Sequence, residues 1–113
     1  MFERGTMFWR EDDKKIIVVL NDTLRTWSAY DDTWSSALPE DTCPGVSLAG
    51  IKPKRGFGKV WCEQASVRAK IGAATSPEQG PYLGSLQRFE RGEMFTGPEG
   101  GLVYVLFNDG KWE

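Results

Sequence analysis

The sequence predicts an α+β fold that is mainly β, in which two related antiparallel β-meanders are joined by a long loop and a short central helix. Three observations predict it. One stretch occurs twice, each copy holds strand-like apolar runs separated by turn residues, and a single stretch between the copies has helical periodicity. A length of 113 residues suits one domain. We expect a single domain over 1–113, with repeat units 2–34 and 84–113 joined by a loop over 35–56 and a helix over 57–71.

The repeated stretch is the clearest signal in the chain. Residues 2–22 read FERGTMFWREDDKKIIVVLND and residues 89–109 read FERGEMFTGPEGGLVYVLFND, so the copies align without a gap at an offset of 87 residues. Nine of the 21 aligned positions are identical. Both copies then reach a tryptophan, Trp27 and Trp112, although the first copy carries two extra residues. Such a repeat indicates two copies of one structural unit.

Each copy predicts a pair of antiparallel strands. These are expected at Thr6–Arg10 and Ile16–Leu20 in the first copy, and at Glu93–Thr96 and Leu102–Phe107 in the second. The second strand of each pair is almost wholly apolar and rich in β-branched residues, which is typical of strands covered on both faces. We therefore expect the two apolar strands to share one interior, which would give the domain pseudo-twofold character.

Turn residues predict the remaining strands. Asn108-Asp109-Gly110 favours a tight hairpin followed by a very short strand, Lys111–Trp112. The weaker turn of the first copy precedes a third strand expected at Leu24–Ser28. A leading strand is expected at Ser85–Phe89, and its counterpart is missing before Phe2. The strand edge left open there favours self-association with another copy.

The central segment 57–71, FGKVWCEQASVRAKI, places apolar residues on one face at spacings of three and four. Gly72 is a natural C-cap for this helix. In the alternative interpretation Ser66 is an N-cap, which splits the segment into two short helices.

The FERG sequence of both copies is interpreted as structural: the phenylalanine packs, the glutamate and arginine pair across strands, and the glycine permits a tight corner. The aromatic residues assigned to the core are Phe2, Phe8, Trp61, Phe89, Phe95 and Phe107.

Composition argues against several classes of function. The chain has no histidine, which removes the commonest general base and most zinc sites, so we expect no enzyme, no metal and no cofactor. Its net charge is −2, from 14 basic and 16 acidic residues, which gives no basic surface for nucleic acid. No apolar run approaches the roughly 20 residues of a membrane span. The opening residues do not read as a signal peptide.

Two segments then indicate a family. The stretch VRAKIGAATSPE at 67–78, followed by QRFERG at 87–92, resembles the LGFP repeat, with Ile71-Gly72 where that family has Leu-Gly. Ala73-Ala74 stand where the family prefers an aromatic residue and a proline. The segment RGFGKVW at 55–61 is similar to bacterial modules that carry it ahead of the same elements.

The resemblance covers residues 55–113 and, more weakly, 2–34. LGFP repeats occur in secreted and cell-surface proteins of bacteria, where they are thought to hold the protein to cell-wall polysaccharide. The resemblance therefore implies a non-catalytic surface module that binds a polysaccharide.

Aromatic residues beside carboxylates are the candidate ligand-binding residues, because sugar rings stack on aromatic planes while carboxylates accept hydroxyl hydrogen bonds. Core packing is the alternative role for the aromatic residues, and a solvated turn is the alternative for the aspartates. The repeat partner of Trp9 is Thr96, so the repeat itself does not require an aromatic there. The candidates are Trp9, Tyr30, Asp31, Asp32 and Trp34.

The two cysteines leave two alternatives. A bridge between Cys43 in the loop and Cys62 in the helix would close a ring of about 20 residues and would need an oxidising compartment. Otherwise both are free thiols. The location expected is extracellular or cell-surface, provided that the sequence is an excerpt of a longer exported protein. A second functional hypothesis is a structural or protein-interaction module that self-associates or packs on a partner domain through its β edges.

Overall fold

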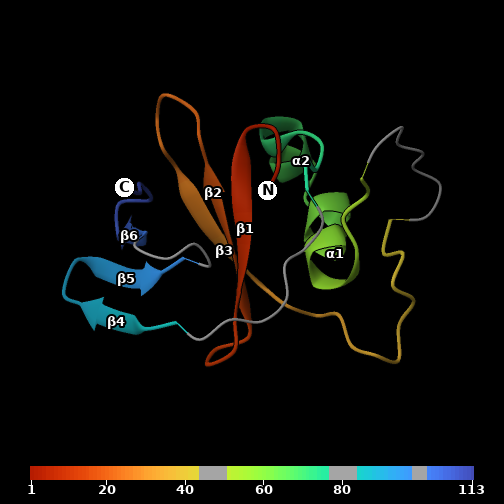
Figure 1. The fold of residues 1–113 in the computed structure, drawn as a ribbon, viewed down its shortest axis with the longest axis horizontal. Helices are drawn as coiled ribbons and strands as arrows, with labels where there is room; N and C mark the ends of the chain where they lie inside the picture. The colour runs from red at the N-terminus through yellow and green to blue at the C-terminus, as the bar shows by residue number, and fades with distance from the viewer. Residues whose placement is uncertain (44–50, 77–83, 98–101) are drawn as a thin grey trace.

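The structure, a computed structural model, describes residues 1–43, 51–76, 84–97 and 102–113 (Figure 1). Two three-stranded antiparallel sheets form, in the orders β1-β2-β3 and β4-β5-β6. The fold is therefore α+β and mainly β with two meanders, as the sequence predicts. Its helices and strands are β1 (Gly5–Arg10), β2 (Lys15–Leu20), β3 (Trp27–Asp31), α1 (Arg55–Glu63), α2 (Ala65–Ile71), β4 (Leu86–Phe89), β5 (Gly92–Thr96) and β6 (Val103–Phe107).

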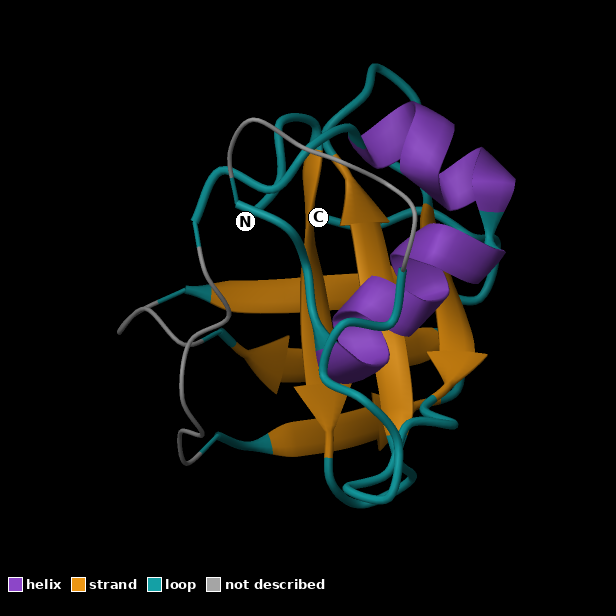
Figure 2. Ribbon diagram, turned by 90° about the vertical axis from the view of Figure 1, so that its right-hand side faces the viewer, coloured by secondary structure: helices purple, strands orange, loops and turns teal. Residues whose placement is uncertain are grey.

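The first sheet, β1–β3, is the middle of three layers. Figure 2 shows α1 and α2 over one of its faces and the second sheet, β4–β6, behind the other, with the strands of the two sheets running in crossing directions. Side chains alternate along a strand, so Ile16 and Val18 of β2 face the helices while Ile17 and Val19 face the second sheet. The unbroken apolar run of β2 is thus explained by cover on both faces.

Two hydrophobic cores result from this layering. The helix-side core lies between the first sheet and the helices and comprises Phe2, Met7, Ile16, Val18, Leu20, Cys43, Val60, Trp61, Val67 and Ile71. The sheet-interface core lies between the two sheets and comprises Phe8, Ile17, Val19, Phe95, Leu106 and Trp112.

The strand register repeats along with the sequence. Met7 pairs with Val18 across β1 and β2, and Met94 pairs with Val105 across β5 and β6, which is the same pairing shifted by 87 residues. The two copies therefore form similar hairpins, with β1 equivalent to β5 and β2 equivalent to β6.

The FERG glycine makes the same close approach in both hairpins. A Cβ atom at Gly5 would lie 2.2 Å from the carbonyl oxygen of Val19, and one at Gly92 would lie 2.2 Å from that of Leu106. Real Cβ atoms do not approach an oxygen so closely, so only glycine lets the neighbouring strand pass at this point.

The two units are joined by a reciprocal exchange between their tryptophans. The Trp27 indole N–H donates to the carbonyl of Phe107 at 2.7 Å, and the Trp112 indole N–H donates to the carbonyl of Leu20 at 2.7 Å. Leu20 and Phe107 are repeat equivalents. A contact in which each unit gives and receives the same bond is the pattern of a twofold-related pair.

The backbone around these tryptophans repeats the exchange. The Trp27 N–H donates to the carbonyl of Gly110, and the Trp112 N–H donates to that of Arg25, both at 2.8 Å. Arg25 and Gly110 hold equivalent places before their tryptophans and both have left-handed φ angles, 49° and 88°. The expected pseudo-twofold character is therefore present at the junction of the units.

The predicted third strand of the first unit was wrong in position. It was expected at Leu24–Ser28 but forms at Trp27–Asp31. The Arg25 N–H bonds the Asp22 carboxylate at 2.7 Å, and the left-handed φ of Arg25 lengthens the turn. The strand therefore starts only at the tryptophan.

The single predicted helix was also wrong, because two helices form. The break lies at Gln64, whose φ and ψ are −99° and 86°, and no side chain caps α2 there. The break lets α2 fold back on α1, so that the Trp61 indole donates to the carbonyl of Gly72 at 2.9 Å. The alternative of two short helices is correct, with its boundary at Gln64 and not at Ser66.

The glutamate and arginine of FERG do something other than pair across strands. In the first unit the Glu3 carboxylate accepts the N–H of Ala73 at 2.7 Å, and Arg4 Nε donates to the carbonyl of Lys70 at 2.9 Å. Both side chains thus hold the C-terminal end of α2.

The second sheet differs from the expectation that its apolar strand is covered on both faces. Leu106 is fully buried, whereas Val103 is 52% exposed. Phe89, assigned to the core, is also 52% exposed, and Phe107 is half-buried. The helices lie against the first sheet, so the outer face of the second sheet has no equivalent cover among the described residues. Phe2, Phe8, Trp61 and Phe95 are buried as predicted.

A disulfide joins Cys43 to Cys62 of α1, with their Cα atoms 5.4 Å apart. The bridge pins the loop after β3 to the helix that covers the first sheet. Within the described ranges no helix has the length and apolar character that a membrane crossing requires.

Candidate functional site

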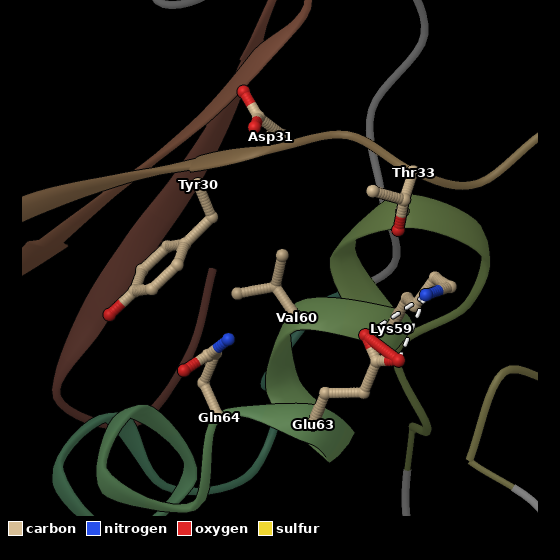
Figure 3. A pocket seen from close by; sticks show the side chains of 8 residues that line it. Tyr30, Asp31, Thr33, Lys59, Val60, Glu63 and Gln64 are labelled. Atoms are coloured by element: carbon tan, nitrogen blue, oxygen red, sulfur yellow. Dashed lines mark hydrogen bonds and ion pairs between the residues drawn. The ribbon is translucent and has the colours of Figure 1, made fainter.

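A hollow of about 240 Å³ lies where the end of β3 meets α1 (Figure 3). The Tyr30 ring stands on one side and the Lys59–Glu63 pair on the other, with Val60 between them. The lining residues are Tyr30, Asp31, Thr33, Gly56, Lys59, Val60, Glu63 and Gln64.

The β3 wall follows from strand alternation. Tyr30 points toward the helices and packs against the helix-side core, while the next residue, Asp31, is exposed. Asp31 faces Lys15 in the register of β2 and β3, and its carboxylate accepts from the Lys15 ammonium at 2.5 Å. The end of β3 therefore presents a phenol and a carboxylate on one rim of the hollow.

The α1 wall is placed by glycine and by helical spacing. A Cβ atom at Gly56 would lie 2.5 Å from Oδ1 of Asp32 and 3.0 Å from Cδ1 of Ile16, so glycine lets the start of α1 lie directly on the sheet. Lys59 and Glu63 are four residues apart and pair at 2.9 Å on the exposed side of the helix. Their charges stand opposite Tyr30.

Asp32 and Trp34 lie beside the hollow without lining it. The Asp32 carboxylate accepts the Trp34 N–H at 3.1 Å, and the Trp34 indole donates to the carbonyl of Pro39 at 2.9 Å. The Arg55 guanidinium lies 5.7 Å from the centroid of the Trp34 ring. These contacts brace the loop that follows β3.

Trp9 lies on the same face of the first sheet as Tyr30 but on the far side of Ile16. It pairs with Ile16 in β1 and β2, and Ile16 pairs with Tyr30 in β2 and β3, so two strand spacings, about 10 Å, separate the candidates. Trp9 is 44% exposed, and the Lys14 ammonium lies 5.7 Å from its ring centroid. It is therefore not part of the hollow.

Two carboxyl groups of the braced loop have lowered pKa values. A hydrogen bond from Arg55, and then the charge of that guanidinium, hold the pKa of Glu40 below its ordinary value. A hydrogen bond from Lys52, and then the N–H of Cys43, do the same for the pKa of Asp41. Both contacts anchor the loop next to the disulfide.

The structure thus gathers two of the five candidates, Tyr30 and Asp31, into one hollow. The helical residues that complete it were missed, because nothing in the sequence indicates which strand end α1 approaches. The i, i+4 spacing of Lys59 and Glu63 is the one signal that marked them as a surface pair.

The chemistry of the hollow suits a small polar group. It combines an aromatic ring and Val60 with convergent donors and acceptors, namely a carboxylate, a hydroxyl, an amide and an ion pair. Its volume is just below the range of about 300–1,000 Å³ that is usual for ligand pockets, so it suits one ring of a ligand. In the part of the chain that the structure describes, no group of three or more His, Cys, Asp or Glu residues is placed to hold a metal ion.

No family model, curated protein or solved structure matches this chain. The resemblance to the LGFP repeat stays a prediction that rests on the residues quoted for it.

Proposed function

We propose that this chain is a non-catalytic module that binds one sugar ring of a bacterial envelope polysaccharide in the hollow between β3 and α1. The observation that carries the proposal is the convergence of the Tyr30 ring with Asp31, Lys59 and Gln64 around one small hollow. An aromatic plane suits the C–H face of a sugar, and the polar rim suits its hydroxyl groups.

The Cys43–Cys62 disulfide supports an extracytoplasmic location. The resemblance to LGFP repeats points to the same compartment and to the same class of ligand. The lack of histidine supports a binding role over catalysis.

The test is retention of the full chain on bacterial cell-wall fractions, followed by titration with fragments of the fraction that retains it. We expect Asp31→Asn to weaken binding about tenfold or more, because hydrogen bonds to a charged acceptor are the strong ones. Thr33→Val, which removes a hydroxyl and keeps the shape, should weaken it less.

The matched control is Lys15→Gln. This change breaks the same Lys15–Asp31 ion pair from the side that does not line the hollow, so binding should be kept. No retention of the unmodified chain by any wall fraction overturns the proposal. Equal binding by the Asp31→Asn and unmodified chains overturns the assignment to this hollow.

A protein-interaction module is the second candidate. The strand order leaves β1 at one edge of the first sheet, which is the edge where self-association was predicted.

A further inference from the structure

The outer face of the second sheet is the counterpart of the face that α1 and α2 cover, and no described helix or strand packs on it. Five apolar residues alternate onto it, beside the polar Gln87 and Thr96, and the repeat equivalents of the five in the first unit all belong to the helix-side core. They are Phe89, Met94, Val103, Val105 and Phe107, equivalent to Phe2, Met7, Ile16, Val18 and Leu20.

Exposure separates the two faces clearly. Ile16 is fully buried, whereas its equivalent Val103 is 52% exposed. Met7 is 5% exposed, and its equivalent Met94 is 39% exposed. Apolar residues clustered on one sheet face in this way are typical of an interaction surface.

A polar pair borders the bare face as well. In the first unit, Glu3 and Arg4 bond the end of α2 through the N–H of Ala73 and the carbonyl of Lys70. Their equivalents, Glu90 and Arg91, are exposed, and their side chains bond none of the described residues. The second unit therefore carries both the apolar face and the polar clamp that hold a helix end in the first.

We propose that this face docks a helix pair of the α1–α2 type supplied by a partner. Such a partner presents a short amphipathic helix that ends at a left-handed glycine, as α2 ends at Gly72 with φ 80°. Its apolar side covers Met94 and Val103. Its last carbonyls accept from Arg91, and the N–H beyond its glycine donates to Glu90.

The number of helix pairs argues against a second copy of this chain as the source of the docked helices. Among the described residues each chain has one helix pair and two faces of this kind, so an exchange of helices between copies leaves as many bare faces as before. A partner that docks a helix pair here must therefore bring one that does not already cover its own sheet.

The test appends a second copy of residues 54–76 after Glu113 of the full chain. A flexible Gly/Ser linker of about 30 residues is long enough, because α1 begins 28 residues after Trp27, the counterpart of Trp112. The appended copy carries Cys62→Ser so that the Cys43–Cys62 bridge is undisturbed. We expect NMR shifts at Met94, Val103 and Val105, together with slower amide exchange in β5 and β6.

The matched control is the same extension with Ile71→Asp in the appended copy alone. A buried, unpaired carboxylate is strongly disfavoured, so the shifts should vanish while the first unit is untouched. Arg91→Ala in the second sheet should reduce the shifts in part, because it removes the bonds to the helix carbonyls.

Two outcomes overturn the proposal. One is that the extension leaves the Met94 and Val103 signals unchanged, or that the Ile71→Asp version shifts them equally. The other is that the unextended chain sediments as a dimer that Val103→Asp converts to a monomer, since a second copy then covers the face.

Discussion

The first and second sheets are built from the same hairpin, yet they are buried very differently. Met7 and Met94 occupy equivalent register positions, beside Val18 and Val105. Met7 lies in the helix-side core, whereas Met94 stands at the surface. One face of each hairpin meets the other hairpin, and only the first hairpin has its second face covered by α1 and α2.

The repeat therefore specifies a hairpin and a junction but not a complete set of layers. The residues that meet between the sheets are equivalents of one another, such as Phe8 and Phe95, whose ring centroids lie 5.1 Å apart. In the part of the chain that the structure describes, the helix pair occurs once and lies on one side. Each hairpin carries apolar residues on both faces, but the helices pack only on the first sheet. The outer face of the second sheet is therefore apolar and exposed.

The two tryptophans at the junction between the units should differ most in their contribution to stability. Trp112→Ala should lower the free energy of unfolding by about 3–5 kcal/mol, because it removes a buried ring and its bond to Leu20. Trp27 makes the equivalent bond but is half-buried, so Trp27→Ala should have a smaller effect. Urea denaturation of both variants measures this, and equal losses would contradict the asymmetry.

The disulfide cross-links only the cover of the first unit. The double variant Cys43→Ser, Cys62→Ser should be less stable by about 3 kcal/mol, from the loop-closure entropy of a ring of about 20 residues. Denaturation of the unmodified chain with and without reductant provides the same comparison without a mutation. Identical midpoints in the two conditions would mean that the bridge does not form in solution.

A matched pair of substitutions measures how much the helices contribute to stability by burying the first sheet. Met7→Ala should cost at least about 2 kcal/mol, as large-to-small changes in a core do. Met94→Ala, the same change at the equivalent exposed position, should cost about 0.5 kcal/mol or less. Thermal and denaturant unfolding give both values, and similar losses would show that the second face is covered in the isolated chain.

The smallest expected effect concerns the ion pairs that link the units at the other end of the first sheet. Arg10 pairs with Glu93 at 2.7 Å, and Arg88 pairs with Asp12 at 3.0 Å. Slight desolvation acts to raise the pKa of Asp12, but the hydrogen bonds from Arg88 and the Asp13 N–H, with the charges of Arg88 and Arg10, lower it overall.

A pKa below that of the unfolded chain means that the Asp12 contribution is present above the ordinary value of 3.8 and is lost as the pH falls through the folded value. With Arg88→Gln, the free energy of unfolding should therefore decrease less steeply as the pH falls below that value. Denaturant midpoints of the variant and of the unmodified chain, measured across the acid range, test this. If both midpoints fall equally with pH, the Arg88–Asp12 contact does not contribute to the pH dependence of stability.

Much of the fold was predictable because its signals are local. The hairpins follow from almost wholly apolar, β-branched runs separated by turn residues, and from the FERG glycine, which allows a close strand approach at Gly5. The third strand was misplaced because the Asp22–Arg25 bond, a detail of turn geometry, sets where it starts. Of the candidate site, Tyr30 and Asp31 were identified, whereas Lys59 and Gln64 were not, because their approach to β3 depends on how α1 packs.

The order of the amino acids is enough to predict the duplicated hairpin, the FERG corner and the tryptophan that ends each unit, since these depend on residues close together in the chain. Packing between the elements determines which faces are buried, because burial depends on elements far apart in sequence. It set α1 and α2 against Ile16 and left Val103 in solvent, although both residues hold the same place in the repeat.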